Sequence, residues 1–453
     1  MDINVLKFGG TSMADHETWK QVLKIIAQYE YPVVVVSATA RTTRKLVEAG
    51  NLAANGKLGE AKVIAAEIKD RHEQIVQDFL SNNPHAKNKL IRESCLKNLH
   101  AKIGKLNKLL DYTARQETLS PQMNDAISAI GEQISSYLLA QCGLALNMMT
   151  QHIEARKIIK TDNEYGQANP NFFKITQHSG SLETVLENGF TPIIGGFYGE
   201  APDKTVTTLG FEGSDYSASL IGGAINAKTI EIWTDVSGIY TGDPRFIPEA
   251  KPLAELSYID ATEMAYFGAK VLHPSTLKPA QEKNIPVFVK NIFEPDEPGT
   301  KIIRASEYEP DVLAISFKRG MATLTVSAYE TVMGYSFLTK VFTVLEKHRL
   351  AVDAVNTTEA SVTITLENTN ALKDLSKAFI EIGNVSLEQE KGLLTLIGCS
   401  INSPKKLTSK IFDVLDTTSI DQISFSKEKR ILNLVLPEDE LIKAAQRVHK
   451  KLF

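Results

Sequence analysis

The sequence predicts an α/β protein: a mostly parallel central sheet between two layers of helices, a three-layer αβα sandwich, followed by two smaller β-α-β-β-α units. In the first two thirds of the chain, short apolar runs end at small or polar residues and alternate with helical patterns. Unalternating runs of this kind are typical of strands buried on both faces. After about residue 310, a strand-helix-strand order occurs twice, which predicts the paired units.

Strands of the parallel sheet are expected at five apolar runs: Val5-Leu6, Val33 to Val36, Ile193-Ile194, Ile230 to Trp233 and Ile285 to Val289. The first expected helix begins after Ser12 to Asp15, because the next apolar residues recur on one helical face. From about Gly59 to Glu117, spaced apolar residues lie among many charges. We expect this stretch, residues 59–117, to be a helical excursion from the same domain.

A change of texture between Asn291 and Pro310 predicts a domain boundary, since Glu294 to Thr300 is rich in turn-forming residues that cannot continue a helix or a central strand. The first domain is therefore expected over residues 1–295 and the two small units over 311–385 and 386–453. Their expected elements are Ala322 to Ala328, Phe337 to His348 and Ser361 to Leu366, then Leu393 to Ile397, Lys406 to Leu415, Ile431 to Leu436 and Glu438 to Leu452.

Composition argues against several classes of function. Lys plus Arg number 50 against 54 for Asp plus Glu, so no positive excess exists to drive binding to nucleic acid or to a membrane surface. Cys95, Cys142 and Cys399 are widely spaced, which argues against a disulfide framework or a zinc site. The sequence has no signal-peptide pattern and no apolar run of membrane-spanning length, so we expect a soluble, cytoplasmic protein.

The first candidate for chemistry is Lys7 to Ser12, which places a lysine on a buried strand, two glycines at its end and hydroxyls at a helix start. Glycines let backbone amides approach phosphate oxygens, and the helix start and the lysine add positive charge. The structural alternative is a strand that ends in Gly-Gly and merely turns into a helix. No P-loop or dinucleotide-binding glycine motif stands in a fitting context, so neither of those enzyme classes is supported.

Three later segments carry further candidates. Thr207 to Tyr216 is a glycine-bearing loop before a helix, with Ser214-Asp215 as the expected cap, and an ordinary capped helix remains the alternative. Trp233 to Arg245 follows a buried strand, and loops at the carboxyl ends of strands bind ligands in open α/β sheets. Phe267 to Pro274 contains Lys270, which could also be a simple surface lysine.

Together and in this order, these segments resemble the aspartate kinase family. The similarity includes Lys-Phe-Gly-Gly-Thr-Ser at 7–12, Trp-Thr-Asp-Val-x-Gly-Ile-Tyr-Thr-x-Asp-Pro-Arg at 233–245, Phe-Gly-Ala-Lys-Val-Leu-His-Pro at 267–274, and shorter matches at 131–132, 160–162 and 165–166. It covers essentially the whole chain and is nearest to the monofunctional, lysine-sensitive type. The resemblance implies an amino-acid-kinase catalytic domain followed by two ferredoxin-like ACT-type regulatory domains.

The implied reaction is ATP-dependent phosphorylation of the L-aspartate side-chain carboxylate to 4-phospho-aspartate, the first step toward lysine, threonine and methionine. Because the acceptor is already an anion, catalysis would rest on alignment and charge neutralisation without a general base. The implied cofactors are ATP and Mg²⁺, the metal being held through ATP phosphates and not by a protein cluster. An amino-acid effector, lysine foremost, and a homodimer or higher homo-oligomer formed through the ACT-type units are also implied.

Residue roles follow from the resemblance. Lys7 and Asp215 are the expected catalytic residues. The expected nucleotide-binding residues are Lys7, Gly9, Gly10, Ser12, Thr234, Asp235, Tyr240, Arg245 and Lys270, and the expected amino-acid site holds Ser37, Thr43, Glu132, Ser214 and Asp215. The effector site is expected in the loop Val332 to Phe337 and the segment Val352 to Glu359, where Asp353 would pair with an effector ammonium beside Thr358 and Glu359. Alternatively, Asp353 is a solvated turn residue.

One departure from the family pattern concerns the acceptor. The family loop usually reads Gly-Arg-Gly-Gly-Ser-Asp, and its arginine grips the α-carboxylate, but here Phe211 stands at the arginine position with Glu212 beside it. Arg41 and Arg44, where relatives tend to have glycine and asparagine, could supply the missing cation, or they could be solvated residues at a helix start. The alternatives for the whole chain are a weak or inactive paralogue that acts as an amino-acid-sensing subunit, and a kinase for a different small acid.

Overall fold

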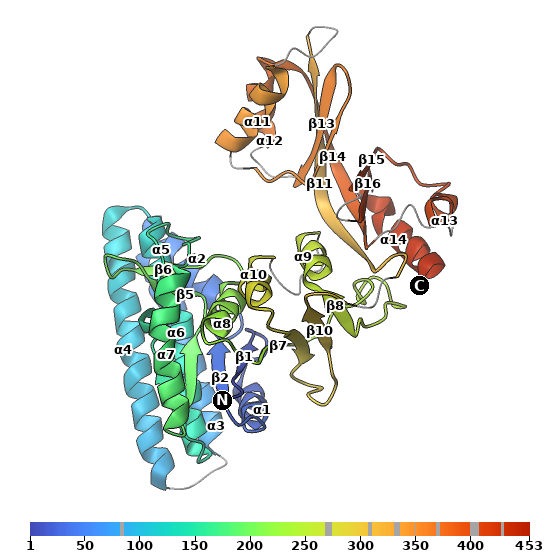
Figure 1. Ribbon diagram of the computed structural model, residues 1–453. Coiled ribbons are helices and arrows are strands. Elements are labelled where there is room, and N and C mark those ends of the chain that lie inside the picture. Colours follow the sequence, from blue (N-terminus) through green and yellow to red (C-terminus); the bar gives the residue numbers. More distant parts are fainter. Residues whose placement is uncertain are drawn as a thin grey trace. The chain divides into compact units, whose positions relative to one another are not determined.

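The computed structural model describes residues 1–81, 86–267, 274–306, 310–329, 336–348, 350–367, 372–398, 407–426 and 430–453 (Figure 1). The chain forms two units. The first contains Met1–Ile239, Ala254–Tyr258 and Leu272–Ser306, and the second contains Tyr240–Leu253, Ile259–Val271 and Glu307–Phe453. Two short segments that precede residue 295 therefore pack with the carboxyl-terminal part of the chain. Among the described residues, the helices lack the combination of length and apolar character needed to cross a bilayer.

The first unit is built on an eight-stranded sheet of order β3-β4-β2-β1-β7-β9-β10-β8. Its neighbouring strands pair in parallel except β9 and β10, which are antiparallel, so the expected mostly parallel sheet is confirmed. The strands are β1 Asn4–Phe8, β2 Pro32–Val36, β3 Thr150–Ile153, β4 Thr191–Gly195, β7 Thr229–Thr234, β8 Glu255–Ser257, β9 Val287–Asn291 and β10 Thr300–Ile303. A separate hairpin joins β5 Tyr198–Glu200 to β6 Val206–Thr208.

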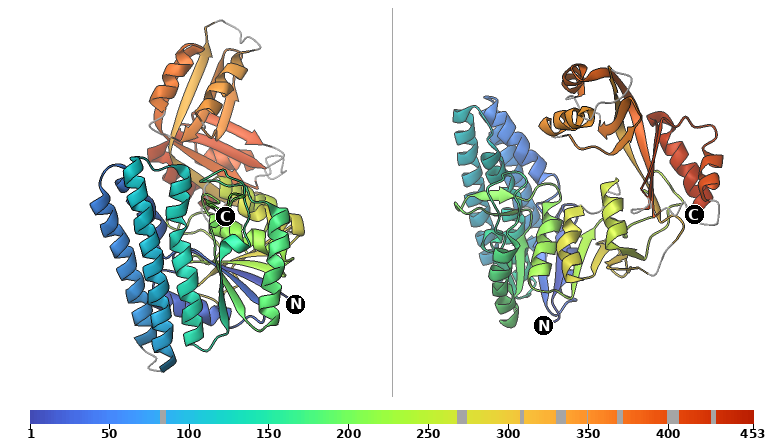
Figure 2. Two further views of the ribbon diagram at one scale, coloured as in Figure 1. Left: turned by 90° about the vertical axis from the view of Figure 1, so that its left-hand side faces the viewer. Right: turned by 45° about the horizontal axis from the view of Figure 1, so that its top comes forward.

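Figure 2 shows the strands of this sheet between two sets of helices, as expected for a three-layer sandwich. The helices of the first unit include α1 His16–Ile26, α2 Thr42–Ala54, α3 Leu58–Ser81, α4 Ala86–Gln116, α5 Pro121–Ser128, α6 Ile130–Ala145, α7 Phe172–Glu187, α8 Gly213–Ala224 and α10 Pro274–Lys283. The predicted helical excursion corresponds to α3 and α4, whose apolar residues join one core with α1, α2 and α6.

The side chains of strand β1 alternate between the two faces of the sheet. Leu6 and Phe8 belong to the core formed with α1 to α6. Val5 faces the other way, since a Cβ placed on Gly222 of α8 would lie 3.6 Å from its Cγ2. Successive side chains of a strand point to opposite faces, so Lys7 shares the α8 side of the sheet with Val5.

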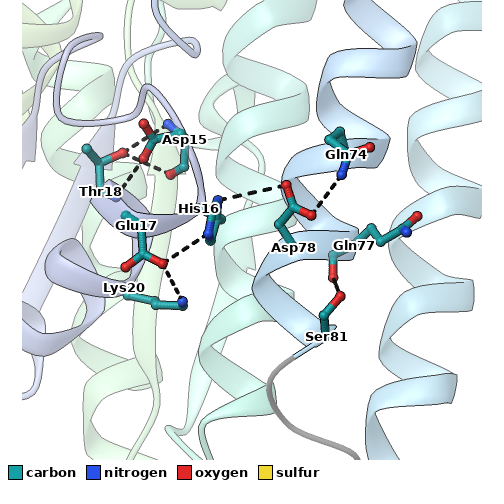
Figure 3. A network of polar contacts seen from close by, with 9 residues as sticks. All are labelled: Asp15, His16, Glu17, Thr18, Lys20, Gln74, Gln77, Asp78 and Ser81. Carbon is teal, nitrogen blue, oxygen red and sulfur yellow. Dashed lines mark hydrogen bonds and ion pairs between the residues drawn. The ribbon is translucent and has the colours of Figure 1, made fainter.

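Helix α1 begins where the sequence indicates. The Asp15 carboxylate accepts a hydrogen bond from the Thr18 amide at 2.9 Å, and the Thr18 hydroxyl takes part in the reciprocal bond of a capping box. Figure 3 shows this cap and the polar contacts next to it: His16 contacts Glu17 of its own helix and Asp78 of α3. These contacts tie the first crossover helix to the helical excursion.

The second unit has a six-stranded antiparallel sheet of order β12-β13-β11-β14-β16-β15. Its strands are β11 Ala314–Ala328, β12 Ala354–Thr357, β13 Ser361–Glu367, β14 Gly383–Ile397, β15 Gln422–Ser426 and β16 Ile431–Pro437, and its helices include α11 Phe337–Lys347, α12 Leu372–Ile380, α13 Leu407–Val414 and α14 Glu438–Leu452. The long strands β11 and β14 pair along their length and serve two separate hydrophobic cores. The boundary expected between residues 385 and 386 falls inside β14, which runs unbroken.

Candidate active site

A buried ion pair joins the central strand to helix α8. Lys7 is 6% exposed and Asp215 is 5% exposed. The Lys7 Nζ lies 2.6 Å from the Asp215 Oδ1. A buried lysine is stable only when it is paired, so each of these charges depends on the other. The pair puts a fixed ammonium group at the carboxyl edge of the parallel sheet, where ligands bind in open α/β folds.

Helix α8 does not begin as the sequence suggested, and the expected cap at Ser214-Asp215 is wrong. The helix starts at Gly213, and Glu212 at the N-cap position makes no side-chain capping bond. Asp215 lies inside the first turn, where its carboxylate meets Lys7. Glu212 has a φ of 53°, a left-handed conformation that costs a non-glycine residue about 1 kcal/mol. An ordinary capped helix therefore does not explain this loop.

The Gly-Gly turn and the loop after β7 meet beside Lys7. The Gly9 amide and the Ser12 hydroxyl both donate to the Trp233 carbonyl, at 3.1 and 3.2 Å. One residue further along, the Thr234 hydroxyl donates to the Asp235 carboxylate at 3.1 Å. A Cβ on Gly9 would lie 3.5 Å from the Lys7 Nζ, which is ordinary contact distance, so this turn lies directly beside the ammonium group. Five of the predicted nucleotide-binding residues thus gather around Lys7.

A pocket of about 290 Å³ opens at the same edge of the sheet. It is lined by Gly10, Ser37, Ala38, Thr39, Ala40, Arg41, Thr43, Arg44, Glu132, Phe197, Gly210, Phe211, Glu212, Gly213 and Ser214. The predicted amino-acid residues Ser37, Thr43, Glu132 and Ser214 therefore share one cavity, and Asp215 is the next residue in the chain. Arg41 and Arg44 line the same cavity as Phe211, which is 79% exposed.

Two carboxylates of this pocket have unsatisfied oxygens. Burial raises the pKa of Glu132 to about 8, against hydrogen bonds from the backbone at Ala38 and at Glu132 itself. Burial and the neighbouring Asp215 raise the pKa of Glu212 to about 7, with Lys7 acting in the opposite direction. Within the described residues, neither Oε2 atom has a hydrogen-bond partner. Unpaired buried carboxylates are unfavourable, so a cationic group of a ligand would stabilise them by pairing with them.

The ligand-free protein is expected to lose stability between pH 5 and pH 8, and Glu132→Gln is expected to reduce this loss. The contribution of Glu132 to stability is fully present below its unfolded pKa near 4.5 and is lost as the pH rises through about 8. The difference should amount to roughly 2–4 kcal/mol. Thermal unfolding of both proteins at a series of pH values measures it, and identical pH dependence of the two would contradict the assignment.

Helix α3 holds the pocket loop in place, a role that the sequence did not reveal. The Arg71 guanidinium donates to the Ala40 carbonyl at 2.5 Å and to the Ala14 carbonyl at 2.9 Å. His72 is fully buried, and burial lowers its pKa to about 4, so its ring is neutral. Its Nδ1 contacts the Ile68 carbonyl and therefore carries the hydrogen, which makes Nε2 the acceptor for the Thr39 hydroxyl at 2.5 Å.

Asp125 holds the other wall of the pocket and was also missed. Its carboxylate accepts hydrogen bonds from the Gly166 amide at 2.9 Å and from both the amide and the hydroxyl of Thr208 at 2.8 Å. The residue has no exposed surface, and burial raises its pKa despite these donors. Asp125 thereby fixes the end of β6, two residues before the Gly210 turn.

Asp125→Ala is expected to destabilise the protein by about 2–4 kcal/mol, because the substitution leaves buried backbone amides without an acceptor. Urea unfolding of the full chain measures the loss. Asp203→Ala is the matched control, since Asp203 also bonds a threonine amide and hydroxyl, those of Thr205, but in an exposed turn. Equal small effects of the two substitutions would show that Asp125 does not support the loop.

The remaining predicted residues lie in the second unit or outside the described chain. Tyr240 and Arg245 belong to the second unit, where Arg245 pairs with Asp243 at 2.6 Å. Lys270 lies outside the described residues, as do residues 332–335 of the predicted effector loop. Thr358 and Glu359 are exposed at a turn. Asp353 is not a solvated turn residue, because its side chain is 5% exposed and forms an ion pair.

The chain is similar to known proteins along its whole length. A family model described as the amino acid kinase family matches residues 2–291. The chain is 31% identical to the lysine-sensitive aspartokinase 3 of Escherichia coli (strain K12), covering 100% of this chain and 99% of that protein. It is 32% identical to the chloroplastic aspartokinase 3 of Arabidopsis thaliana, covering 99% of this chain and 81% of that protein.

Solved structures give the same result for the fold. A crystal structure of E. coli aspartokinase III in complex with aspartate and ADP, in the R-state, matches with a TM-score of 0.85 at 30% identity. A second structure of that protein, in complex with lysine and aspartate in the T-state, matches with a TM-score of 0.82. Each covers 100% of both chains, so the similarity extends through both units.

Proposed function

We propose that the chain transfers the γ-phosphoryl group of ATP to the side-chain carboxylate of L-aspartate, because it belongs to the aspartokinases within the amino acid kinase family. The product would be 4-phospho-L-aspartate. The observation that carries this proposal is the Lys7–Asp215 ion pair at the edge of the sheet, where the pocket between the loops after β2 and β6 also opens. A fixed cation next to a small cavity whose lining includes two carboxylates and two arginines suits the transfer of a phosphoryl group between two anions.

The chain's own residues would act by charge and alignment. A carboxylate oxygen of the acceptor forms a bond to the γ-phosphorus as the bond to the bridging oxygen of ATP breaks, and ADP leaves with the electron pair. Lys7 would neutralise negative charge on the transferring group, and Asp215 would keep the ammonium in position. The Gly10 amide would hold a phosphate oxygen, because the Gly9 amide already donates to the Trp233 carbonyl. No proton has to be removed from the acceptor, so no general base is needed.

Mg²⁺ fits this arrangement as a partner of the ATP phosphates. The described residues contain no group of three or more His, Cys, Asp or Glu that could hold a metal ion alone. One carboxylate oxygen of the pocket, the Oε2 of Glu212, has no hydrogen-bond partner among the described residues. Hard oxygen donors of this kind suit Mg²⁺, which usually binds through a few carboxylates together with substrate phosphates. When bound, the metal would neutralise charge on the phosphate oxygens.

The acceptor would be held by opposite charges within the pocket. Glu132 would receive its ammonium group, and Arg44 or Arg41 would receive the α-carboxylate that Phe211 cannot bind. Arg41 is the N-cap residue before α2 and has a left-handed conformation with a φ of 67°, and Arg44 lies in the first turn of the helix. Both arginines are exposed, and neither guanidinium has an ion pair with another residue that the structure describes. Only arginine offers the planar fork that binds a carboxylate through two bonds.

Regulation by an amino acid, with lysine as the proposed effector, would occur in the second unit. Its continuous six-stranded sheet corresponds to two ACT-type units, which usually pair across subunits, so we also propose a homodimer or higher homo-oligomer. The lysine complex of the E. coli relative supports the choice of lysine.

The proposal is tested by incubating the full chain with ATP, Mg²⁺ and a panel of acids, and trapping any acyl phosphate with hydroxylamine. L-Aspartate is expected to give the highest kcat/KM, with L-glutamate and succinate well below it. A better acid than aspartate would establish a changed substrate, as Phe211 allows. No acyl phosphate with any acid would favour the sensing paralogue.

A further inference from the structure

The carboxylate expected to receive an effector ammonium already contacts an ammonium group of its own chain. Asp353 lies immediately before β12, where its backbone amide donates to the Thr365 carbonyl at 2.9 Å. The Lys318 Nζ, from β11, lies 2.5 Å from the Asp353 Oδ1. The Asp353 side chain is 5% exposed, so a second cation cannot reach this oxygen without displacing Lys318.

Two aromatic rings complete the surroundings of Lys318. Its Nζ lies 5.0 Å from the centroid of the Tyr266 ring and 6.0 Å from that of the Phe267 ring, and the two rings meet edge to face. The cluster is fixed from both sides: the Tyr266 hydroxyl donates to the Val352 carbonyl at 3.3 Å, and the Ser316 hydroxyl donates to the Phe267 carbonyl at 2.8 Å. A carboxylate with aromatic rings is the chemistry that recognises an alkylammonium ion.

We infer that Lys318 is a resident occupant of the ammonium subsite at Asp353, and that it competes with free lysine for this subsite. The inference rests on the effector assignment in the proposed function. A subsite that is available for only a small fraction of the time binds its ligand more weakly by that same fraction. If Lys318 leaves Asp353 one tenth of the time or less, the apparent affinity for lysine falls by about tenfold or more. The chain would then respond to lysine only at high concentration.

Lys391, in the same unit, also pairs with carboxylates but in more exposed surroundings. Lys391 lies 2.6 Å from Asp421 and 2.9 Å from Glu388, so its geometry is as close as that of Lys318. Asp421 and Glu388 are 29% and 61% exposed, however, and no aromatic ring lies over Lys391 among the described residues. Lys391 therefore provides a matched control: it is a paired lysine in the same unit without an enclosed ammonium subsite.

The experiment measures L-lysine binding to the full chain by calorimetry in the absence of nucleotide, so that turnover plays no part. Lys318→Met keeps the length of the side chain and removes the competing charge. We expect Lys318→Met to bind lysine at least about tenfold more tightly than the wild-type chain or Lys391→Met. Adding Asp353→Asn to Lys318→Met should abolish this gain, because the receiving carboxylate is then lost.

One outcome overturns the inference: Lys318→Met binds lysine no more tightly than the wild-type chain does. Lys318→Gln guards against a folding defect, because an amide can still donate to Asp353 and yet carries no charge. Its unfolding temperature should rise with added lysine more than that of the wild-type chain, and an equal rise would contradict competition. Kinase activity is assayed separately, so an inactive wild-type chain would count against the proposed function and not against this inference.

Discussion

Lys7→Ala is expected to lower kcat by at least about 10²- to 10³-fold, with a smaller effect on KM for either substrate. The reason is that the Lys7 ammonium, 2.6 Å from Asp215 at the edge of the sheet, is assigned to the phosphoryl group in the transition state. An interaction made mainly in the transition state affects kcat more than binding. Steady-state kinetics at saturating ATP and aspartate measure the loss, and a kcat near the wild-type value would remove Lys7 from the mechanism.

A loss of folding has to be separated from this loss of catalysis. Removing one member of a buried ion pair leaves the other unpaired, which typically costs about 3–5 kcal/mol of stability. The double variant Lys7→Ala/Asp215→Asn contains no unpaired charge, so it should recover stability without recovering activity. Asp215→Asn alone should also lower kcat strongly. Retained activity per folded molecule in Asp215→Asn would mean that the ion pair only stabilises the fold.

Arg44→Ala or Arg41→Ala is expected to raise the KM for aspartate by at least about tenfold, while the KM for ATP changes little. Both residues line the pocket that contains Phe211, at the position where the family arginine is missing. Loss of one partner of a desolvated charge pair costs about 2–5 kcal/mol, which corresponds to a change in affinity of about thirtyfold to several thousandfold. Arg115→Ala, at the end of α4, is the control because it lies outside the pocket.

A rescue of the affinity for aspartate is also expected. If the cation has moved from position 211 to the loop after β2, then adding Phe211→Arg to Arg44→Ala should restore much of the affinity for aspartate. An unchanged KM in both single arginine variants would show that these arginines are solvated. Phe211 would then indicate a changed substrate or a weak site.

Much of the first unit could be predicted because its signals are local. The apolar runs at Val33 to Val36 and Ile230 to Trp233 correspond to β2 and β7, and the charged stretch at 59–117 corresponds to α3 and α4. The capping box at Asp15 depends on a few adjacent residues. Such features depend on hydrophobic periodicity and neighbouring side chains, which a single sequence contains.

The features that were missed depend on contacts between distant residues. Arg71 and His72 sit on a predicted helix, but nothing in the chain indicates that they support the loop around Ala40. Asp125 meets Thr208 across more than eighty positions. The predicted cap at Ser214-Asp215 is wrong because the Asp215 carboxylate pairs with Lys7, which is far away in the sequence. Only one signal pointed to such roles: His72 continues the apolar face that includes Ile68 and Ile75.

The most direct test of the proposed reaction is phosphorus NMR of the full chain with ATP, Mg²⁺ and L-aspartate, with Lys7→Ala in parallel. A new acyl phosphate resonance is expected that grows with ADP in a one-to-one ratio, depends on aspartate and is absent with Lys7→Ala. Inorganic phosphate and ADP formed without aspartate, or no change in the ATP resonances, would contradict the proposed reaction.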